Sequence, residues 1–578
     1  MALWGNFTYS SSPMGAENFS FQSGSSGDLR YQYVMQHSLQ NVLDTDYRPS
    51  AAREPVFAYA HDFGGVSSAS VRYTIGSVQE PAIRYLTGQG VVPLQPWWKH
   101  CYADIHQMID FHFNDFNATQ ALAARFESQL RADVNAYYSA NTAMGYSNGT
   151  QGHNNTDRYG REYIYNPANS YGFLDPQNFS GIAIPDVDEA DAYYSIVALS
   201  ARQVMGAYVL VIPPSSGAGS DDANSTAPEP LLFQKEISSD GNTNTVDVMY
   251  PTMPFLLYAN PNLLRYSLEP LYQNQEGGFY PNAYSMHDLG SHYPNATGHV
   301  EGDDEYMPVE ESGNMILMSY AYYKFTNDTT YLQTHYPLLR QFASYLTLYS
   351  LLPGYQLSTD DFAGRLANQT NLAIKGIVGL AAMAQIALAN NDPSAAANYS
   401  ATALAFYKQW EQLAIDPTGT HTLLAYNWRS SYSLLYNIYP AYLLSLPIIP
   451  SRLYEMQCRF YPSVSQVFGV PLDSRHVYTK SDESLWTAAT CGGLGAGAGA
   501  EGAGTRRLLV NGVARWINET GTGAPFSDLW DTVGEGGFGG RPEIVEFRAR
   551  PVVGGHFSLL AVGRAREVGG GLRGWERG

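Results

Sequence analysis

The amino-acid sequence predicts a mainly α-helical protein, an (α/α)6 toroid of six helical hairpins preceded by a β-sandwich-like N-terminal domain. Three observations predict this fold. Short alternating apolar and polar runs, typical of strands, end near Pro96, and apolar residues at helical spacing follow. From Asp186 onward the helical segments arrive in pairs with short connections, as in αα-hairpins. Long loops rich in Gly, Asp, His and Tyr separate the pairs, which indicates a functional site at one mouth of the toroid. A plain helical array is the alternative.

The N-terminal domain is predicted from strand-like runs. Residues 4–9, 55–60 and 69–76 are short apolar and aromatic segments, separated by clusters of Gly, Ser or Pro. Because no strands precede residues 4–9 to complete a sheet, we expect this domain to be truncated. Residues 102–140 carry apolar side chains at helical spacing, with Asp and Arg on the opposite side. Residues 145–182, rich in Gly, Asn and Tyr, are predicted to form an irregular loop.

The toroid is predicted from segments of helical length. Asp or Pro stands in the short connections at 326–329 and 390–393, as expected where one helix ends and the next begins. The predicted helices lie at 188–212, 255–272, 310–327, 329–350, 371–390, 393–415, 433–446, 450–466, 482–490 and 505–517.

These elements divide the chain into four regions. Residues 1–165 are the β-rich N-terminal domain with a helical linker at its end, 166–350 the first half of the toroid and 351–562 the second half. The Gly- and Arg-rich residues 563–578 are expected to be a disordered tail. Two low-complexity segments interrupt the pattern, a Gly/Ser/Asp-rich insertion and a run of almost only Gly and Ala, at 213–230 and 492–504.

The charge balance excludes two classes of partner. Lys and Arg number 33 against 53 Asp and Glu, so the net charge is −20. A chain this acidic is repelled by nucleic-acid phosphates and by anionic membrane surfaces, so we predict neither as a partner. No uninterrupted apolar run reaches about 18 residues, so no transmembrane helix is predicted. The 44 tyrosines suit both the walls of clefts and the core.

Cysteines and glycosylation signals point to the compartment. Three cysteines exclude a disulfide framework and leave room for one bridge. The first twenty residues contain no signal peptide. Asn-x-Ser/Thr tripeptides are nevertheless dense, and we therefore expect an extracellular, secreted protein. They begin at Asn6, Asn18, Asn117, Asn148, Asn154, Asn178, Asn224, Asn295, Asn327, Asn368, Asn398 and Asn518.

The densest group of chemically active side chains lies at residues 287–314, with seven acidic residues and three histidines. Glu310 and Glu311 begin a predicted helix, where the helix dipole stabilises carboxylates without any further function. That explanation does not cover the His and Asp side chains of the Gly/Pro-rich loop before this helix. The candidates from this group are Asp304 and Glu311 for catalysis, and His287, Asp288 and His292 for substrate binding.

Two further groups follow. Asp360 and Asp361 are adjacent in a loop between hairpins. Asp360 could cap a helix, and two adjacent loop carboxylates are also a usual source of a general acid or base. Asp473 and Arg475 could pair, or the arginine could bind a substrate carboxylate. The candidates from these groups are Asp360 and Asp361 for catalysis, and Arg365, Arg475 and Glu483 for substrate binding.

Such residue types are suited to hydrolysis. A protonated and an ionised carboxyl group can together protonate a leaving group and activate water. No lipase-type Gly-x-Ser-x-Gly elbow lies in the loops, and no phosphate loop or dinucleotide fingerprint follows a strand. Metal binding by His287, Asp288 and His292 has no His-Glu-x-x-His or paired-Cys motif to support it, so we predict no metal and no cofactor.

Eight short motifs stand along the chain in this order: PVFAYAHD (55–62), FHFND (111–115), ARQVMG (201–206), MPF (253–255), HDLG (287–290), EESGN (310–314), LSTDDF (357–362) and PVVGGH (551–556). In this order and spacing they resemble the fungal glutaminase A family, over nearly the whole chain. The resemblance implies a secreted amidohydrolase that converts glutamine to glutamate and ammonia. It also implies a β-rich N-terminal domain followed by a six-hairpin toroid. The family pattern is interrupted after Trp486 and returns at 516–520.

We therefore expect glutamine amide hydrolysis at the toroid mouth. Asp360 or Asp361 would be one catalytic partner and Glu311 or Asp304 the other, and Arg365 or Arg475 would bind the α-carboxylate of this small-molecule substrate. A glycoside hydrolase is the alternative, because two opposed carboxylates on the same toroid also suit glycosidic bonds. A catalytically inactive secreted binding protein is a third hypothesis, and the oligomeric state stays open.

Overall fold

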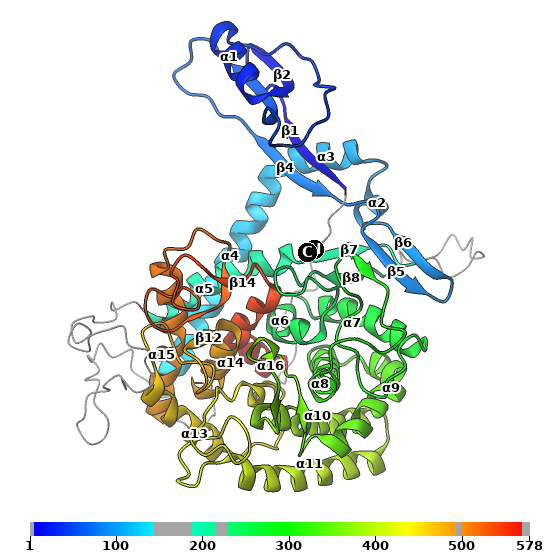
Figure 1. Cartoon of the computed structure of the whole chain (residues 1–578), viewed down its shortest axis with the longest axis vertical. Coiled ribbons are helices and arrows are strands. Elements are labelled where there is room, and N and C mark those ends of the chain that lie inside the picture. The colour runs from blue at the N-terminus through cyan, green and yellow to red at the C-terminus, as the bar shows by residue number, and fades with distance from the viewer. Residues whose placement is uncertain (1–4, 144–187, 215–228, 493–498, 569–578) are drawn as a thin grey trace, which may run out of the picture. The chain divides into compact units, whose positions relative to one another are not determined.

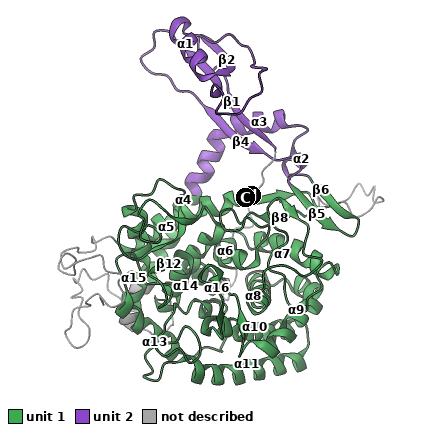
Figure 2. Cartoon of the chain, in the orientation of Figure 1, with its two compact units in different colours: residues 1–2, 83–94, 126–578 green, residues 3–82, 95–125 purple. Residues whose placement is uncertain are grey.

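The computed structural model describes residues 5–143, 188–214, 229–492 and 499–568. The irregular loop predicted at 145–182 and most of the insertion at 213–230 lie outside these residues. Packing divides the chain into two compact units (Figure 2). One contains residues 3–82 and 95–125, and the other contains the hairpin at 83–94 and the chain from residue 126 onward. We call them the N-terminal unit and the toroid unit.

The N-terminal unit is rich in strands, as predicted. β1 pairs antiparallel with β4, and β2 with β3. Aromatic side chains at alternating strand positions hold these ribbons together, and the Tyr9 and Tyr59 ring centroids lie 5.1 Å apart. The elements are β1 (Asn6–Ser11), β2 (Asn18–Ser25), α1 (Ser26–Gln36), β3 (Pro55–Asp62), β4 (Tyr73–Val78), α2 (Trp98–Cys101), α3 (Ile105–Asn114) and the start of α4 (Phe116–Ala143).

The toroid unit is a closed ring of helices (Figure 1). Each inner helix packs against the next, with α10 reaching α12 through the 3-10 turn before it, and the last, α16, packs back on the first, α6. Within the described residues the ring has six outer and six inner helices, as a six-hairpin toroid requires. The segment predicted as one helix at 255–272 is two helices, because Asn260 caps the second and Pro261 begins it, and α16 was not among the ten predicted helices. The outer helices are α5 (Glu189–Gly206), α7 (Pro261–Glu276), α9 (Thr329–Tyr349), α11 (Pro393–Ala414), α13 (Ser451–Phe460) and α15 (Gly499–Glu519). The inner helices are α6 (Val246–Ala259), α8 (Pro308–Thr326), α10 (Thr370–Ala389), α12 (Tyr439–Leu443), α14 (Ser481–Gly492) and α16 (Ser558–Val568), with the 3-10 turns η4 (Tyr436–Ile438) before α12 and η6 (Pro551–Phe557) before α16.

Burial explains which helices are inner. α8 and α10 are buried on nearly every side. For α10 this agrees with its sequence, which is apolar almost all round, whereas α8 also buries polar residues at its start. By length and composition α10 could cross a membrane, but 78% of its most apolar window is buried inside the ring. Outer helices such as α9 bury only one stripe of side chains along their length.

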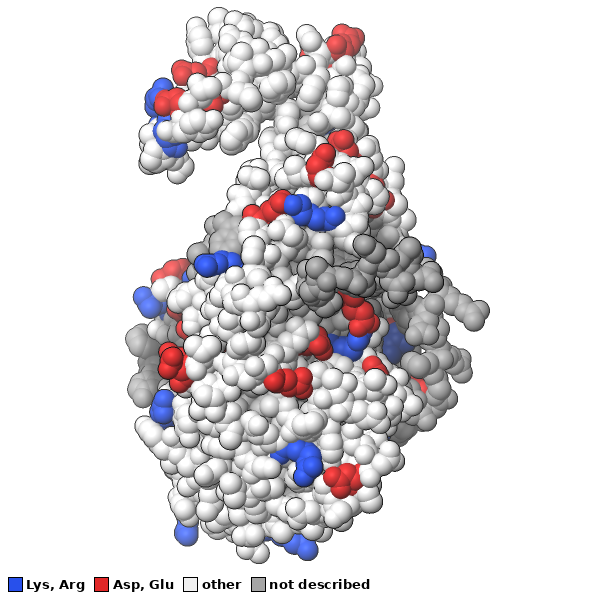
Figure 3. All heavy atoms as spheres, turned by 90° about the vertical axis from the view of Figure 1, so that its right-hand side faces the viewer, with Lys and Arg blue, Asp and Glu red and all other residues white. Residues whose placement is uncertain are grey.

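Acidic and basic side chains are scattered over a mostly uncharged surface on the face seen in Figure 3.

Short sheets hold the long loops of the toroid unit. β5 pairs with β6 and, in parallel, with β9, so the N-terminal hairpin at 83–94 fastens the loop between α7 and α8. β10 and β11 bracket residues 357–365, and β12 ends directly before α14. These strands are β5 (Ile83–Thr87), β6 (Gly90–Leu94), β7 (Tyr208–Val211), β8 (Leu231–Gln234), β9 (Asn295–Ala296), β10 (Tyr355–Gln356), β11 (Leu366–Ala367), β12 (Tyr478–Lys480), β13 (Ser527–Asp531) and β14 (Glu546–Arg548); two further 3-10 turns are η3 (Asp361–Ala363) and η5 (Tyr461–Val464).

Two low-complexity segments contain more helix than their composition predicts. α15 begins at Gly499, inside the Gly/Ala run, because the buried Leu509 and Val513 further along the helix anchor it against the ring. α16 continues through Gly563 to Val568, into the segment for which disorder was expected, since Leu559 and Val562 are buried. Residues 569–578 lie outside the described chain.

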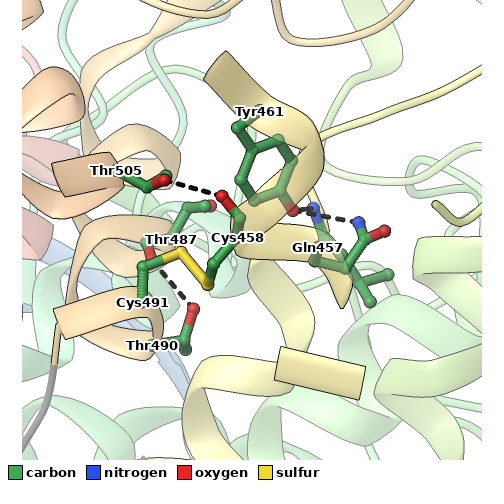
Figure 4. The surroundings of a disulfide bond; sticks show 8 residues. Gln457, Cys458, Tyr461, Thr487, Thr490, Cys491 and Thr505 are labelled. Atoms are coloured by element: carbon green, nitrogen blue, oxygen red, sulfur yellow. Dashed lines mark hydrogen bonds between the residues drawn. A yellow bond between two sulfur atoms is a disulfide. The ribbon is translucent and has the colours of Figure 1, made fainter. Parts of the chain in front are cut away.

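One disulfide joins two helices of the second half of the toroid. Cys458 of α13 is bonded to Cys491 of α14, with the Cα atoms 5.4 Å apart (Figure 4). The carbonyl of Cys458 accepts a hydrogen bond from Thr505 Oγ1 at 2.6 Å, so α15 is attached at the same point. Cys101 is free and exposed.

Replacing Cys458 with Ser is expected to lower the free energy of unfolding by about 2–4 kcal/mol, because the bridge closes a loop of 33 residues. Urea denaturation under oxidising conditions measures this. Cys101→Ser is the control and should leave stability unchanged. A Cys458→Ser protein as stable as the parent would show that the bridge adds nothing to stability.

His556 is buried in η6 beside α5. Its Nδ1 lies 2.6 Å from Ser200 Oγ, which itself donates to the Ile196 carbonyl, so His556 Nδ1–H is the donor. Burial lowers the pKa of His556 to about 3. Below about pH 6.5 the His556 side chain is therefore protonated in the unfolded chain and remains neutral in the folded one.

His556 should make the folded state less stable as the pH falls below about 6.5. Between pH 6.5 and 3 the unfolded state holds the extra proton, so His556 lowers the free energy of unfolding by about 1.4 kcal/mol per pH unit. His556→Asn, measured by urea denaturation at pH 7 and pH 5, should lose about 2 kcal/mol less than the parent over that interval. The exposed His106→Asn variant should follow the parent. Equal losses in all three proteins would contradict this assignment.

Candidate functional site

Titratable side chains gather where the inner helices begin. Asp247, Glu311 and Glu483 stand in the first turns of α6, α8 and α14. The loop between α7 and α8 adds His287, and the loop between β10 and β11 adds Asp361. The N-terminal end of a helix stabilises negative charge, which suits these positions to carboxylates.

Three of these side chains are buried against one another, and we call them the inner triad: Asp247, His287 and Glu311. Their exposed fractions are 7, 3 and 0%. One nitrogen or oxygen atom of each lies within 4.8 Å of the other two, and Nε2 of His287 is 3.7 Å from Oδ1 of Asp247. Within the described chain, that Oδ1 and Oε1 of Glu311 have no hydrogen-bond partner. The inner triad therefore contains buried acceptors that no neighbouring donor satisfies.

Asp288 holds the ring of His287 in place. Its Oδ2 lies 2.9 Å from Nδ1 of His287, and its Oδ1 lies 2.8 Å from Nε2 of His299 and accepts the Gly290 N–H at 2.8 Å. Burial opposes ionisation of Asp288, yet these hydrogen bonds lower its pKa below the usual range. Burial also opposes charge on His287, but the hydrogen bond to Asp288 and the charge of Asp247 raise the pKa of His287 well above its ordinary value. Asp288 is therefore a positioning residue for His287.

Three further carboxylates adjoin the inner triad, and we call Asp240, Glu305 and Asp361 the outer carboxylates. One oxygen atom of each lies within 4.8 Å of the others, and Oε2 of Glu305 is 3.7 Å from Nε2 of His287. Burial, with the charges of Asp247 and Glu305, raises the pKa of Asp361 to about 7. Burial raises the pKa of Glu305 as well, and the charge of His287 opposes part of that rise. A carboxyl group that keeps a proton near neutral pH thus lies beside a more exposed carboxylate, which is an arrangement for acid and base catalysis.

Asp360, next in the chain to Asp361, belongs to a separate buried cluster with Lys480, Asp482 and Glu483. Lys480 Nζ lies 3.1 Å from Oε1 of Glu483 and 3.8 Å from Oδ2 of Asp482. Burial raises the pKa of Asp482 to about 6 and that of Glu483 well above its usual value, and the charge of Asp360 adds to the rise on Glu483. One lysine thus balances one of three carboxyl groups, and the raised pKa values of Asp482 and Glu483 favour protonation within the cluster.

Glu310 is occupied by a buried ion pair. Lys375 of α10 donates to its Oε1 and, at 2.9 Å, to Oδ1 of Asn314, and neither charged side chain is exposed. The Lys375 ammonium also lies 4.1 Å from the centroid of the Tyr250 ring. This pair joins α8 to α10, so Lys375 is not available to Glu311.

The structure brings several predicted site residues together and places others elsewhere. His287, Asp288, Glu311 and Asp361 lie in or beside the inner triad, and Asp360 and Glu483 share the lysine cluster. Asp304 accepts hydrogen bonds from Tyr280 Oη at 3.0 Å and the His287 N–H at 2.7 Å, and burial raises its pKa. Asp304 therefore holds its loop in position.

The remaining three lie apart from the triad. His292 is exposed, with φ of 66°, and its side chain contacts neither the inner triad nor the outer carboxylates in the described chain. Arg475 is committed to Asp473 through Nη2 at 2.7 Å and also donates to the Ala363 carbonyl at 3.1 Å. Arg365 is exposed and has no hydrogen-bond or ion-pair partner among the described residues.

Sequence reasoning missed four residues of this site. Asp240 and Asp247 stand in no motif, and Lys480 lies three residues before Glu483 without being a candidate itself. Glu305 is the residue after Asp304 and is the one of the two that faces His287. The acidic run at 303–305 was the signal for Glu305; Asp247 had none, because a single Asp among apolar helix residues resembles an ordinary helix start.

Comparison with known proteins matches two family models. The model described as "Glutaminase A six helical-hairpin domain" matches residues 190–560, and the one described as "Domain of unknown function (DUF5127)" matches residues 1–133. The chain is 37% identical over 563 residues to Glutaminase A of Aspergillus oryzae, covering 97% of this chain and 70% of that protein. It is 33% identical over 660 aligned residues to a protein of Arthroderma benhamiae named "Probable glutaminase", covering 98% of this chain and 67% of that one. Among solved structures, the glucoamylase of Saccharomycopsis fibuligera is similar with a TM-score of 0.40 at 11% identity, over 66% of this chain and 97% of that one.

Proposed function

The chain belongs to the glutaminase A family, and from this membership we propose that it is a glutaminase, a hydrolase that releases ammonia from the side-chain amide of glutamine. The observation that carries the proposal is the 37% identity to Glutaminase A of Aspergillus oryzae over 97% of this chain. The family match at 190–560 also contains the inner triad and the outer carboxylates. The substrate is therefore a small molecule.

The outer carboxylates supply the acid and the base. Glu305 takes a proton from water, and the hydroxide formed attacks the amide carbon. Asp361, with its pKa raised to about 7, donates its proton to the leaving nitrogen, so that the C–N bond breaks and ammonia departs. Of the two arginines predicted to bind the α-carboxylate, Arg475 is already paired with Asp473, and binding by Arg365 stays a prediction.

The test is product formation by the purified chain. We expect ammonia and glutamate in equal amounts from L-glutamine, and no reducing sugar from malto-oligosaccharides. Sugar release without ammonia would replace the proposal by a glycoside hydrolase. Binding of glutamine without turnover would replace it by a binding protein.

We also propose that the protein is a secreted glycoprotein. A disulfide persists in an oxidising compartment, and Cys458–Cys491 is one. Of the eight glycosylation signals in the described chain none is buried, and Asn6, Asn18, Asn117, Asn327, Asn398 and Asn518 are exposed. Endoglycosidase treatment of protein from a secreting host should lower its mass. An unchanged mass would refute glycosylation.

A further inference from the structure

The inner triad has the composition and geometry of a cation site. Its three members are at least nine-tenths buried, and Oδ1 of Asp247 and Oε1 of Glu311 have no hydrogen-bond partner in the described chain. Leaving two buried carboxylate oxygens without a donor is costly, and such atoms call for an ion or a water. We propose that the inner triad binds one divalent transition-metal cation of the Zn²⁺ or Mn²⁺ type. This inference goes beyond the glutaminase activity and does not depend on it.

The orientation of His287 supports the proposal. Its Nδ1 faces Oδ2 of Asp288 at 2.9 Å, so Nδ1–H is the donor when the ring is neutral and the lone pair of Nε2 faces the triad. Nε2 lies 3.7 Å from Oδ1 of Asp247, too far for a hydrogen bond. A carboxylate behind a histidine is the usual second partner of a metal-binding ring, and here Asp288 is itself held by His299.

The spacing leaves room for a cation. Donor atoms bound tetrahedrally to a metal at about 2.0–2.1 Å lie about 3.3 Å apart. The triad atoms lie within 4.8 Å of one another before any ion binds, so a small side-chain adjustment would bring them to that spacing. A cation that binds here displaces the ring proton of His287, and the two carboxylates then balance its divalent charge. Lys375 does not compete for them, because it is paired with Glu310. The nitrogen donor favours Zn²⁺ over Ca²⁺, which prefers oxygen ligands alone, and the two carboxylates also suit Mn²⁺.

A second buried histidine in the toroid unit shows the contrast. His335 lies between two carboxylates, with Nδ1 2.8 Å from Glu276 and Nε2 3.5 Å from Glu269. The side chains of these two carboxylates are 32 and 31% exposed, so water can satisfy their oxygens and no buried acceptor calls for a cation. Glu276→Gln is therefore the matched control for the triad variants.

The experiment uses the untagged full chain, stripped with EDTA and titrated with zinc chloride in a calorimeter. We expect one equivalent of zinc per chain and a rise in the unfolding temperature with zinc. Glu311→Gln and Asp247→Asn should weaken binding at least about tenfold, and Glu276→Gln should bind as the parent does. Substoichiometric binding, or parental affinity in both triad variants, would overturn the proposal.

X-ray absorption of the zinc-loaded parent protein identifies the zinc ligands, and it tests the proposal even if the triad variants fail to fold. The proposal requires one imidazole nitrogen in a shell otherwise made of oxygen. Two or more imidazoles would place the zinc on other histidines and overturn the proposal. Ammonia release is measured separately, so an active protein that binds no zinc refutes the cation site alone, and an inactive protein that binds zinc refutes the glutaminase assignment alone.

Discussion

Asp361→Asn is expected to lower kcat/KM for glutamine by about 10²–10⁴-fold, the usual contribution of a general acid. The asparagine has the same shape but cannot release a proton to the leaving ammonia. The substitution also removes repulsion from Asp247 and Glu305, the charges that raise the pKa of Asp361, so the folded state should be no less stable. Stopped-time ammonia assays and a thermal melt measure the two effects. The exposed Glu301→Gln, in the loop of Glu305, is the control and should keep parental activity.

The pH profile separates an acid role from a structural one. Because Asp361 acts in its protonated form with a pKa of about 7, kcat/KM of the parent should fall about tenfold per pH unit above pH 7. The residual activity of Asp361→Asn should lack this fall. A folded variant that keeps more than half of the parental kcat/KM, or the same descending limb, would remove Asp361 from the mechanism.

Lys375→Met should be the most destabilising of the substitutions considered, with a loss of about 3–5 kcal/mol in the free energy of unfolding. Lys375 and Glu310 are both fully buried, Lys375 donates to Oε1 of Glu310, and Oε2 has no hydrogen-bond partner in the described chain. Removing the lysine leaves a carboxylate with no cation between two inner helices, and Asn314 also loses its donor. Urea denaturation at pH 7 measures the loss.

The double variant Lys375→Met with Glu310→Gln tests the cause. Because it removes both charges, it should regain most of the lost stability. Lys408→Met, on the exposed side of α11, should change stability by less than about 0.5 kcal/mol. A loss below 1 kcal/mol in Lys375→Met, or no recovery in the double variant, would show that the pair is not what holds α8 and α10 together.

Local sequence predicted the ring because the signals of a helical hairpin are local. Apolar spacing near 3.6 residues and short connections such as 326–329 depend on neighbouring residues alone, and α8, α9, α10 and α11 follow them closely. The Gly/Ala run misled because Gly lowers helix propensity, whereas burial of Leu509 and Val513 decides the outcome. Burial of apolar side chains therefore outweighs low helix propensity where a helix packs against a ring of other helices.

The choice between neighbouring side chains in the site loop needed the tertiary structure. Asp304 and Glu305 are adjacent and both acidic, yet one binds Tyr280 and the other faces His287. His292 and His299 lie in one loop, and only His299 reaches Asp288. The pairing of β9 with β5 sets the backbone of this loop, and β5 lies about 200 residues away along the chain.

By itself the sequence determined the fold class, the helical pairs and the three acidic segments from which the site is drawn, because periodicity and composition act over a few residues. Tertiary structure alone decided which members of those segments meet. Asp247, His287 and Glu311 are brought together by the packing of α6 against α8 and by the loop between α7 and α8, and no local pattern marks Asp247. Contacts between residues this far apart depend on how helices pack, and packing is a property of the whole ring.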